Sequence, residues 1–188
     1  MEDLINDVYA VYASGSNNVF FSADIVSMFD SISMDSMVEI ISTRLCCKIK
    51  GGFVHLPSLI EPIKIDTNLF DFFKFIPPTI SKHKKIEYYH QRAGIPMGGN
   101  TSSIYADIYV SYCISRARFK LEQLGVLLLR KYVDDLLFYA PMDNISNIVQ
   151  VLKDCTKLDF TFELANEGVL SYLDVTLKDV SGHLSTTW

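Results

Sequence analysis

The chain has 188 residues, of which 49% are hydrophobic and 21% charged, and its formal net charge is −5. These fractions are typical of one globular domain with a sizeable core and exclude a disordered chain. The 22 acidic residues outnumber the 17 basic ones. This balance argues against nonspecific nucleic-acid binding, which relies on Lys and Arg at the phosphates. A function on nucleic acid must therefore account for the missing positive charge.

No apolar run approaches the ~20 residues that a membrane-spanning helix needs. The first residues, M-E-D-L-I-N-D, are acidic and lack the basic and apolar regions of a signal peptide. We therefore expect an intracellular protein without a membrane partner. The cysteines form no CxxC pair and do not combine with His at zinc-ligand spacing, so reduced thiols are expected. They are Cys46, Cys47, Cys113 and Cys155.

The N-terminal third predicts a helix, a strand and a second helix. Residues 1–14 carry apolar side chains at helical spacing, and residues 14–18 break that pattern. Residues 19–29 have the composition of a buried strand, with Asp24 near its end. A charge among apolar neighbours is costly unless it is paired or binds a metal. Ser33 is expected to cap the next helix, whose apolar stripe is Met37, Ile40, Ile41 and Leu45.

The middle of the chain predicts only short elements, because glycines and prolines interrupt residues 46–90. A short buried helix is suggested by Leu69, Phe72, Phe73 and Phe75, and a strand by residues 87–91. The basic run 82–85 favours a solvated loop over a phosphate contact. Residues 93–103, A-G-I-P-M-G-G-N-T-S-S, predict a tight turn where the backbone approaches something closely. Such a turn before a helix suits phosphate or template contact, although many loops share the pattern.

The segment from Leu127 to Tyr139, L-L-L-R-K-Y-V-D-D-L-L-F-Y, predicts a hairpin with Asp134 and Asp135 at its tip. Successive side chains of a strand point to opposite faces, but a turn can present both carboxylates near one point. Two carboxylates about 4 Å apart repel by roughly 4 kcal/mol at an effective dielectric near 20. The pair is therefore expected to hold a proton or to bind a cation. An ordinary solvated turn is the alternative, since Asp is a common turn residue.

The last third predicts a helix followed by strands. The helix has its apolar stripe at Ile145, Ile148, Val149 and Leu152, and Asn144 is its expected cap. Residues 160–164 alternate like a strand, residues 166–168 form a turn, and Leu173, Val175 and Leu177 alternate again. No repeat is present. We therefore expect residues 1–188 to form one domain of mixed strands and helices.

Strands separated by helices can pair in one sheet, which would bring Asp24 beside the hairpin. Such a cluster suits two divalent ions about 3.5–4 Å apart, which activate an attacking oxygen and stabilise a leaving one. Magnesium is held by a few carboxylates and by substrate phosphates, so no His or Cys is needed. The three aspartates therefore favour phosphoryl transfer.

Three segments in this order resemble motifs A, B and C of reverse transcriptases: D-I-V-S-M-F at 24–29, G-I-P-M-G at 94–98 and Y-V-D-D at 132–135. The flanking residues resemble the Penelope-like class, relatives of telomerase, from about residue 20 to the end. The matching stretches are 88–98, 131–137, 171–178 and 182–187. The resemblance implies an α/β (α+β) polymerase palm, an antiparallel sheet with helices packed on one face, with partial fingers.

The resemblance also assigns roles to the acidic residues. Asp24 and Asp134 match the two principal metal-ligating aspartates, Asp135 matches the supporting one, and the backbone carbonyl of Ile25 completes the metal site. The implied cofactor is a pair of Mg²⁺ ions, for which Mn²⁺ can substitute.

Nucleotide and template contacts are implied for a second group of residues: Phe29, Gly94, Met97, Gly98 and Tyr132. Phe29 stands where the family places its steric gate, a ring that leaves no room for a ribose 2′-hydroxyl. The alternative for Phe29 is a core aromatic side chain. Gly94, Met97 and Gly98 match the loop that faces template and incoming nucleotide.

Residues 160–178 would cover the end of the palm and the hairpin that supports the primer terminus. Lys157 is a candidate for the lysine that protonates the leaving pyrophosphate, although a solvated surface lysine is the better interpretation. Many relatives have Gln at the position of Met97, and Gly99-Asn100 replaces the usual Ser-Pro. Only 23 residues precede Asp24 and the chain ends where a thumb would begin. We therefore expect the basic fingers and thumb to be largely absent, which would explain the acidic net charge.

The implied function is an RNA-directed DNA polymerase core that adds deoxynucleotides to a DNA 3′-end on an RNA template. Its partners would be RNA template, DNA primer, dNTPs and the fingers and thumb of a longer parent chain. One alternative is the palm of an RNA-dependent RNA polymerase, against which Phe29 argues. The other is a noncatalytic palm that serves as a nucleic-acid- or protein-binding scaffold. Retention of all three aspartates disfavours the scaffold.

Overall fold

The computed structural model describes residues 2–13, 16–33, 35–37, 39–40, 48–50, 53–55, 63–64, 75–80, 86–90, 94–95 and 102–187. The chain divides into two compact units, one of Met1–Val26 with Cys113–Trp188 and one of Ser27–Tyr112. Met97, Gly98 and the basic run 82–85 lie outside the described residues. None of the described helices is long and apolar enough to cross a membrane.

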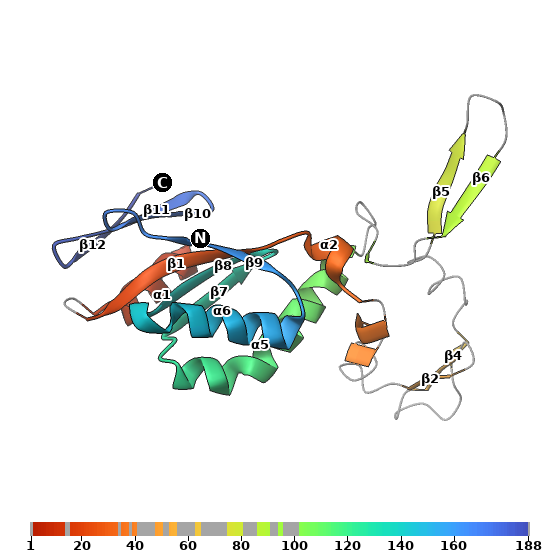
Figure 1. Ribbon diagram of the computed structural model, residues 1–188, viewed down its shortest axis with the longest axis horizontal. Coiled ribbons are helices and arrows are strands. Elements are labelled where there is room, and N and C mark those ends of the chain that lie inside the picture. Colours follow the sequence, from red (N-terminus) through yellow and green to blue (C-terminus); the bar gives the residue numbers. More distant parts are fainter. Residues whose placement is uncertain are drawn as a thin grey trace. The chain divides into compact units, whose positions relative to one another are not determined.

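The first unit is built on a four-stranded antiparallel sheet with strand order β7-β8-β1-β9 (Figure 1). Its elements are α1 (Glu2–Val11), β1 (Asn18–Ile25), β7 (Leu128–Tyr132), β8 (Asp135–Pro141), the 3-10 helix η2 (Met142–Asn144), α6 (Ile145–Thr156), β9 (Phe160–Leu164), β10 (Val169–Tyr172), β11 (Val175–Val180) and β12 (His183–Thr187). The last three strands form a second antiparallel sheet, in the order β10-β11-β12. The long helix α5 (Ser102–Gln123) belongs to both units.

The second unit holds short elements, as the sequence predicts. They are α2 (Met28–Ser31), β2 (Lys48–Lys50), β3 (Phe53–His55), β4 (Ile63–Lys64), β5 (Phe75–Ile80) and β6 (Ile86–His90). The predicted strand at 87–91 is present as β6. The suggested helix near Phe75 is wrong at that residue, because Phe75 begins β5 and pairs with His90; its other residues lie outside the described part. Ser33 caps its helix as expected, since the Ser36 N–H donates to Ser33 Oγ at 3.4 Å.

Aromatic pairs on both faces fix the register between β1 and β8. Phe20 lies opposite Tyr139 with ring centroids 4.5 Å apart, and Phe21 lies opposite Phe138 with centroids 4.8 Å apart. Cross-strand aromatic pairs stabilise a sheet beyond their buried area. A slip of one residue would move every side chain to the other face. The register that these rings hold is the one that places Asp24 opposite Asp135.

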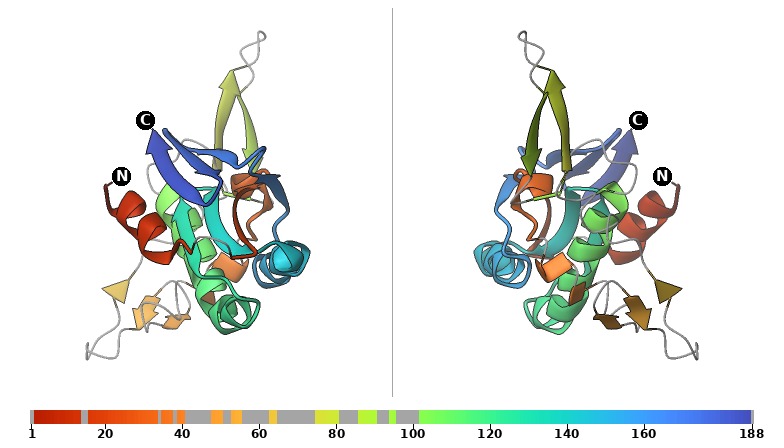
Figure 2. Two further views of the ribbon diagram at one scale, coloured as in Figure 1. Left: turned by 90° about the vertical axis from the view of Figure 1, so that its left-hand side faces the viewer. Right: turned by 90° about the vertical axis from the view of Figure 1, so that its right-hand side faces the viewer.

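Both faces of the main sheet are covered near its centre, since residues 136–140 of β8 are fully buried. On one face a core cluster joins α1, the main sheet and the second sheet; its buried members are Val8, Phe20, Leu128, Leu137, Tyr139, Leu170, Tyr172, Val175 and Leu177. Figure 2 shows α6 on the opposite side of the sheet from α1. The predicted antiparallel sheet with packed helices is confirmed, and α1 adds a helix on the second face.

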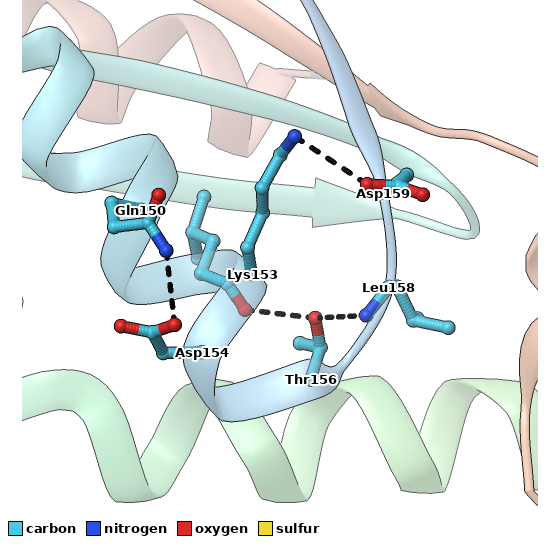
Figure 3. Close-up of polar contacts among 7 residues, drawn as sticks. Gln150, Lys153, Asp154, Thr156, Leu158 and Asp159 are labelled. Carbon is cyan, nitrogen blue, oxygen red and sulfur yellow. Dashed lines mark hydrogen bonds and ion pairs between the residues drawn. The ribbon is translucent and has the colours of Figure 1, made fainter.

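Figure 3 shows the polar contacts at the junction between α6 and β9, the strand that pairs with residues 21–25 of β1. The buried hydroxyl of Thr156 donates to the Leu152 carbonyl at 2.8 Å and accepts from the Leu158 N–H at 3.1 Å. Lys153 forms an ion pair with Asp159 at 3.4 Å. The Asp159 carbonyl then accepts from the Val26 N–H at 2.9 Å, which attaches the loop to the residue that follows β1.

Three sequence predictions differ from the structure in detail. The strand expected over 19–29 ends at Ile25, and Phe29 lies in α2 instead. Asn144 precedes α6 but makes no capping bond, because its side-chain amide donates to the Leu124 carbonyl at 2.9 Å. Leu173 lies in the turn between β10 and β11 with a φ of 53°, so it does not continue a strand. Cys113 and Cys155, the cysteines in the described part, form no disulfide.

Candidate active site

The predicted hairpin is formed by β7 and β8, and its two-residue turn is Val133-Asp134. Tyr132 pairs with Asp135 at the base of the turn. Val133 has a φ of 54°, which is an unfavourable conformation for a β-branched residue. Such strain persists only where the surrounding structure enforces it, and it is frequent at functional sites. The hairpin tip therefore combines a strained backbone with two adjacent carboxylates.

Asp24, Asp134 and Asp135 lie together at one end of the main sheet. Asp24 is directly opposite Asp135 in the β1–β8 register. The Ile25 N–H donates to the Asp134 carbonyl at 3.2 Å, which places the backbone of Ile25 beside the turn. The structure thus brings together the four residues that the sequence assigns to the metal site. Their catalytic role stays a prediction.

The carboxylates at this end of the sheet repel one another. Partial burial raises the pKa of Asp24, the charge of Asp134 raises it further, and a hydrogen bond with the Ile25 backbone partly offsets the rise. Partial burial also raises the pKa of Asp135, followed by the charges of Asp134 and Asp24. A bound divalent cation would relieve this repulsion, since an opposite charge nearby favours the ionised form of a carboxylate.

The donor set fits magnesium better than a metal that needs a closed protein cage. Over the described residues, no three His, Cys, Asp or Glu side chains are grouped closely enough to hold a metal ion by themselves, and this includes the three aspartates. Mg²⁺ is usually held by one or two carboxylates together with water and substrate phosphates. Asp24, Asp134 and Asp135 supply hard oxygen donors of that kind, and neither Cys nor His is required.

A hollow of about 370 Å³ opens beside these aspartates, between β9 and the β10–β11 hairpin. Its lining adds polar side chains that the sequence analysis did not select: Ser22, Thr161, Glu163, Ser171 and Tyr172. Thr161 pairs with Asp24, and Glu163 pairs with Ser22 on the same side of the sheet. The alternation of F-T-F-E-L already places Thr161 and Glu163 on one face, but the partner strand is not apparent from the sequence.

Tyr172 connects the second sheet to the aspartates. Its hydroxyl donates to the backbone carbonyl of Asp135 at 3.3 Å. Burial and the charge of Asp135 raise the pKa of Tyr172 to about 12, so the hydroxyl remains a donor at neutral pH.

A second hollow of about 370 Å³ lies on the other side of Tyr172 and Leu173, which line both hollows. This one contains the basic residues Arg130 and Lys131 and the aromatic ring of Tyr132. Tyr132 is 61% exposed, which suits the nucleotide or template contact expected of it. Basic side chains are therefore present next to the acidic site, but Asp3 and Asp174 line the same hollow and Arg130 is paired with Asp7.

In the second unit, Gly94 lies against α2, the helix that contains Phe29. Gly94 has a φ of 74°, and a Cβ atom there would lie 2.8 Å from the Phe29 carbonyl oxygen. The Ile95 N–H donates to that oxygen at 2.6 Å. The close approach expected of the turn at 93–103 is present at Gly94, against the backbone of Phe29 and Asp30 in the same unit. Residues 93 and 96–101 of that turn lie outside the described part. The nucleotide roles of Phe29 and Gly94 stay predictions.

Lys157 is exposed and ends α6 in the left-handed conformation, where its N–H donates to the Lys153 carbonyl at 2.8 Å. This placement agrees with the interpretation of Lys157 as a surface lysine.

The sequence matches no protein-family profile and no curated protein. Solved structures with a similar fold include a telomerase from Candida albicans in complex with a fragment of telomeric RNA, with a TM-score of 0.68 and 13% identity over 97% of this chain and 33% of that one. Apo telomerase from Candida Tropicalis gives a TM-score of 0.67 with 10% identity, over 98% of this chain and 36% of that one.

A BmCPV RNA-dependent RNA polymerase in its elongation state is similar at a TM-score of 0.59 and 11% identity, over 97% of this chain and 17% of the polymerase. This chain therefore spans about a third or less of these three structures. At such low identity the comparisons concern the fold alone. They show that the chain has a nucleic-acid polymerase fold, shared with telomerase and with a viral RNA polymerase.

Proposed function

We propose that the chain is the palm core of an RNA-directed DNA polymerase, related to the Penelope-like reverse transcriptases. The observation that carries the proposal is the pairing of Asp24 with Asp135 beside the Asp134 turn, at an open end of a sheet with a polymerase fold. The telomerase structures support the choice of a reverse transcriptase, while the viral RNA polymerase shares the same fold.

In this proposal, Asp24 and Asp134 hold two magnesium ions, Asp135 supports them, and the Ile25 carbonyl adds a ligand. The bound ions supply activation of the primer 3′-oxygen and stabilisation of the leaving oxygen. The protein residues contribute position and charge, which is where most of the catalysis of phosphoryl transfer lies. The β1–β8 register holds Asp24 and Asp135 side by side before substrate arrives. No large rearrangement of the sheet is therefore needed.

Tyr132 and Phe29 are assigned to the substrates. Tyr132 presents an exposed ring next to the two aspartates of the turn, where a base of the primer–template can stack. Phe29 is assigned to sugar selection, since a ring at that position would exclude a ribose 2′-hydroxyl. RNA template, DNA primer and dNTPs are the proposed partners, together with the fingers and thumb of a longer parent chain, and we propose an intracellular location.

Two alternatives make different predictions for nucleotide choice. An RNA-dependent RNA polymerase would share the fold and the aspartates, as the viral neighbour illustrates. A noncatalytic scaffold would share the fold and bind nucleic acid without extending it. Partial burial, and then the charges of neighbouring aspartates, raise the pKa values of Asp24 and Asp135. This disfavours the scaffold, because carboxylates held in this way have no benefit unless a cation is bound.

The discriminating experiment is primer extension on an RNA template by the protein at its natural full length. A DNA primer with dNTPs and an RNA primer with NTPs are compared in Mg²⁺ and in Mn²⁺. We expect metal-dependent incorporation of dNTPs only. Preference for NTPs would reassign the protein to the RNA polymerases. Binding of the primer–template without extension under any of these conditions would favour the scaffold.

A further inference from the structure

The tips of two hairpins meet at the carboxylate site. One tip is the Val133-Asp134 turn of β7–β8, and the other is the turn between β10 and β11, which begins at Leu173. Both turns place a large apolar residue at positive φ, 54° for Val133 and 53° for Leu173. Both residues are also partly exposed, at 38% and 39%. Neither turn is therefore held by a favourable local backbone conformation.

Tyr172 connects these tips. It closes the β10–β11 hairpin, where it pairs with Val175, and its side chain is only 4% exposed within the core cluster. Its hydroxyl reaches out of that cluster to the backbone carbonyl of Asp135 at 3.3 Å. A buried ring that packs against the core is a rigid support, so the hydrogen bond attaches the first residue of β8 to the second sheet.

Asp135 is the point at which the hairpin needs such support. The residues that follow it in β8 are fully buried and fixed by packing, while Val133 and Asp134 before it form the strained turn. Its carboxylate faces Asp24 across the β1–β8 pair and is repelled by it and by Asp134. Repulsion and strain both act to displace the tip, and the bond from Tyr172 opposes that displacement.

We propose that Tyr172 is a positioning residue that holds the backbone of Asp135 so that its carboxylate stays beside Asp24. The role rests on the proposed function, in which these aspartates bind the metal ions. Tyr172 acts through Asp135 and does not touch substrate. It also forms the wall, with Leu173, that separates the acidic hollow from the hollow lined by Arg130 and Lys131.

The test compares Tyr172→Phe with a matched control, Tyr12→Phe. Both changes remove one phenolic hydroxyl and keep the ring. The Tyr12 hydroxyl donates to Asp179 at 2.7 Å, which joins the residue that follows α1 to β11 without involving Asp134 or Asp135. Any general loss of stability from a missing hydroxyl should therefore be at least as large in the control.

Two measurements are made on the full chain, and neither requires polymerase activity. Hydrogen–deuterium exchange reports the backbone amides of residues 133–137. The Mn²⁺ dissociation constant is obtained from the loss of the free-ion EPR signal, with Asp134→Asn used to identify binding at this site. In Tyr172→Phe we expect both the exchange rate and the dissociation constant to rise about two- to fivefold, the effect of one neutral hydrogen bond. Tyr12→Phe should match the wild type in both.

A Tyr172→Phe protein that keeps wild-type Mn²⁺ affinity, or that changes no more than Tyr12→Phe, overturns the positioning role. If Asp134→Asn binds Mn²⁺ with the same dissociation constant as the wild type, the assignment of the metal site to these aspartates is overturned as well. Primer extension separates the two ideas. A protein that shows both Tyr172-specific changes and incorporates no nucleotide would count against the proposed polymerase and would still support the role of Tyr172.

Discussion

At the scale of single residues, the site holds three carboxylates, those of Asp24, Asp134 and Asp135, whose negative charges repel one another. Asp24 and Asp135 have raised pKa values because they are partly buried and lie near other acidic charges. A group whose pKa is higher in the folded state contributes stability that is present below its unfolded pKa and is lost as the pH rises through its folded pKa. These aspartates therefore reduce the stability of the metal-free protein at neutral pH.

Replacement of Asp135 by Asn should therefore stabilise the metal-free protein at pH 7. We expect a gain of up to about 1 kcal/mol, since solvent screens charges that are partly exposed. The gain should shrink as the pH is lowered through the folded pKa of Asp135, because the wild-type carboxyl then also becomes neutral. Urea unfolding of both proteins between pH 4 and 7, without divalent ions, measures it.

Asp154→Asn is the control for this change. Asp154 lies on α6, not on the strands and turn of the three aspartates, and accepts a hydrogen bond from Gln150 at 3.0 Å (Figure 3). It should give no gain at pH 7. An Asp135→Asn protein that is less stable than wild type at pH 7 would contradict the account of repulsion.

Phe29 carries the prediction on sugar selection. If its ring occupies the space of the 2′-hydroxyl, Phe29→Ala should lower the preference for dNTPs over NTPs by about tenfold or more, the scale on which a pocket discriminates by size. The measurement is the ratio of kcat/KM for dNTP and NTP in single-nucleotide extension. Phe119→Ala, at a 69% exposed ring on α5, is the control and should leave the ratio unchanged. An unchanged ratio in Phe29→Ala would assign Phe29 to the core.

At the scale of elements, the sequence predicts what depends on periodicity and misses what depends on tertiary contact. The apolar stripes of α1 and α6 and the alternation of β9 and β11 each identify their element, because those patterns follow the geometry of helix and strand. The turn at Leu173 has no glycine or asparagine to mark it, and it is enforced by the pairing of Tyr172 with Val175.

The site shows the same division. Asp24, Asp134 and Asp135 are visible in the sequence as carboxylates among apolar runs, and the structure brings them together. Thr161 and Tyr172 cannot be recognised as site residues in the sequence. Thr161 reaches the site through its strand pairing with Asp24, and Tyr172 through a long-range hydrogen bond to Asp135. The helix cap expected of Asn144 is missing for a related reason, because its side-chain amide donates a hydrogen bond to the distant Leu124 carbonyl instead.

The turn of the β7–β8 hairpin should gain stability from a residue that tolerates positive φ. The left-handed conformation costs a non-glycine residue roughly 1–2 kcal/mol, and Val133→Gly removes this cost. The unfolded chain gains entropy from the glycine, which offsets part of the stabilisation. We expect a net stabilisation of about 0.5–1 kcal/mol in the free energy of unfolding by urea.

Val180→Gly provides the comparison, since Val180 is an exposed valine in β11 without a positive φ. That variant should be destabilised by about 0.5–1 kcal/mol. If both variants lose stability to the same extent, the backbone of the turn is not strained.

At the scale of the whole molecule, the charge of −5 is the feature least expected of a polymerase. The chain spans 33% of the Candida albicans telomerase structure and 17% of the viral polymerase, so most of each neighbour has no counterpart here. Under the proposed function, acidic residues that bind cations account for part of this balance. Basic residues such as Arg130 and Lys131 remain next to the acidic site.

The central claim is that the three aspartates at the end of the sheet catalyse nucleotide addition. It is tested most directly by incorporation of a single dNTP on an RNA template with a DNA primer, by the natural full-length protein and its Asp134→Asn and Asp154→Asn variants. We predict Mg²⁺-dependent incorporation by the wild type and by Asp154→Asn, and a loss of at least about a hundredfold in Asp134→Asn, as for removal of a group that stabilises transition-state charge. Equal activity in the wild type and Asp134→Asn would contradict the claim.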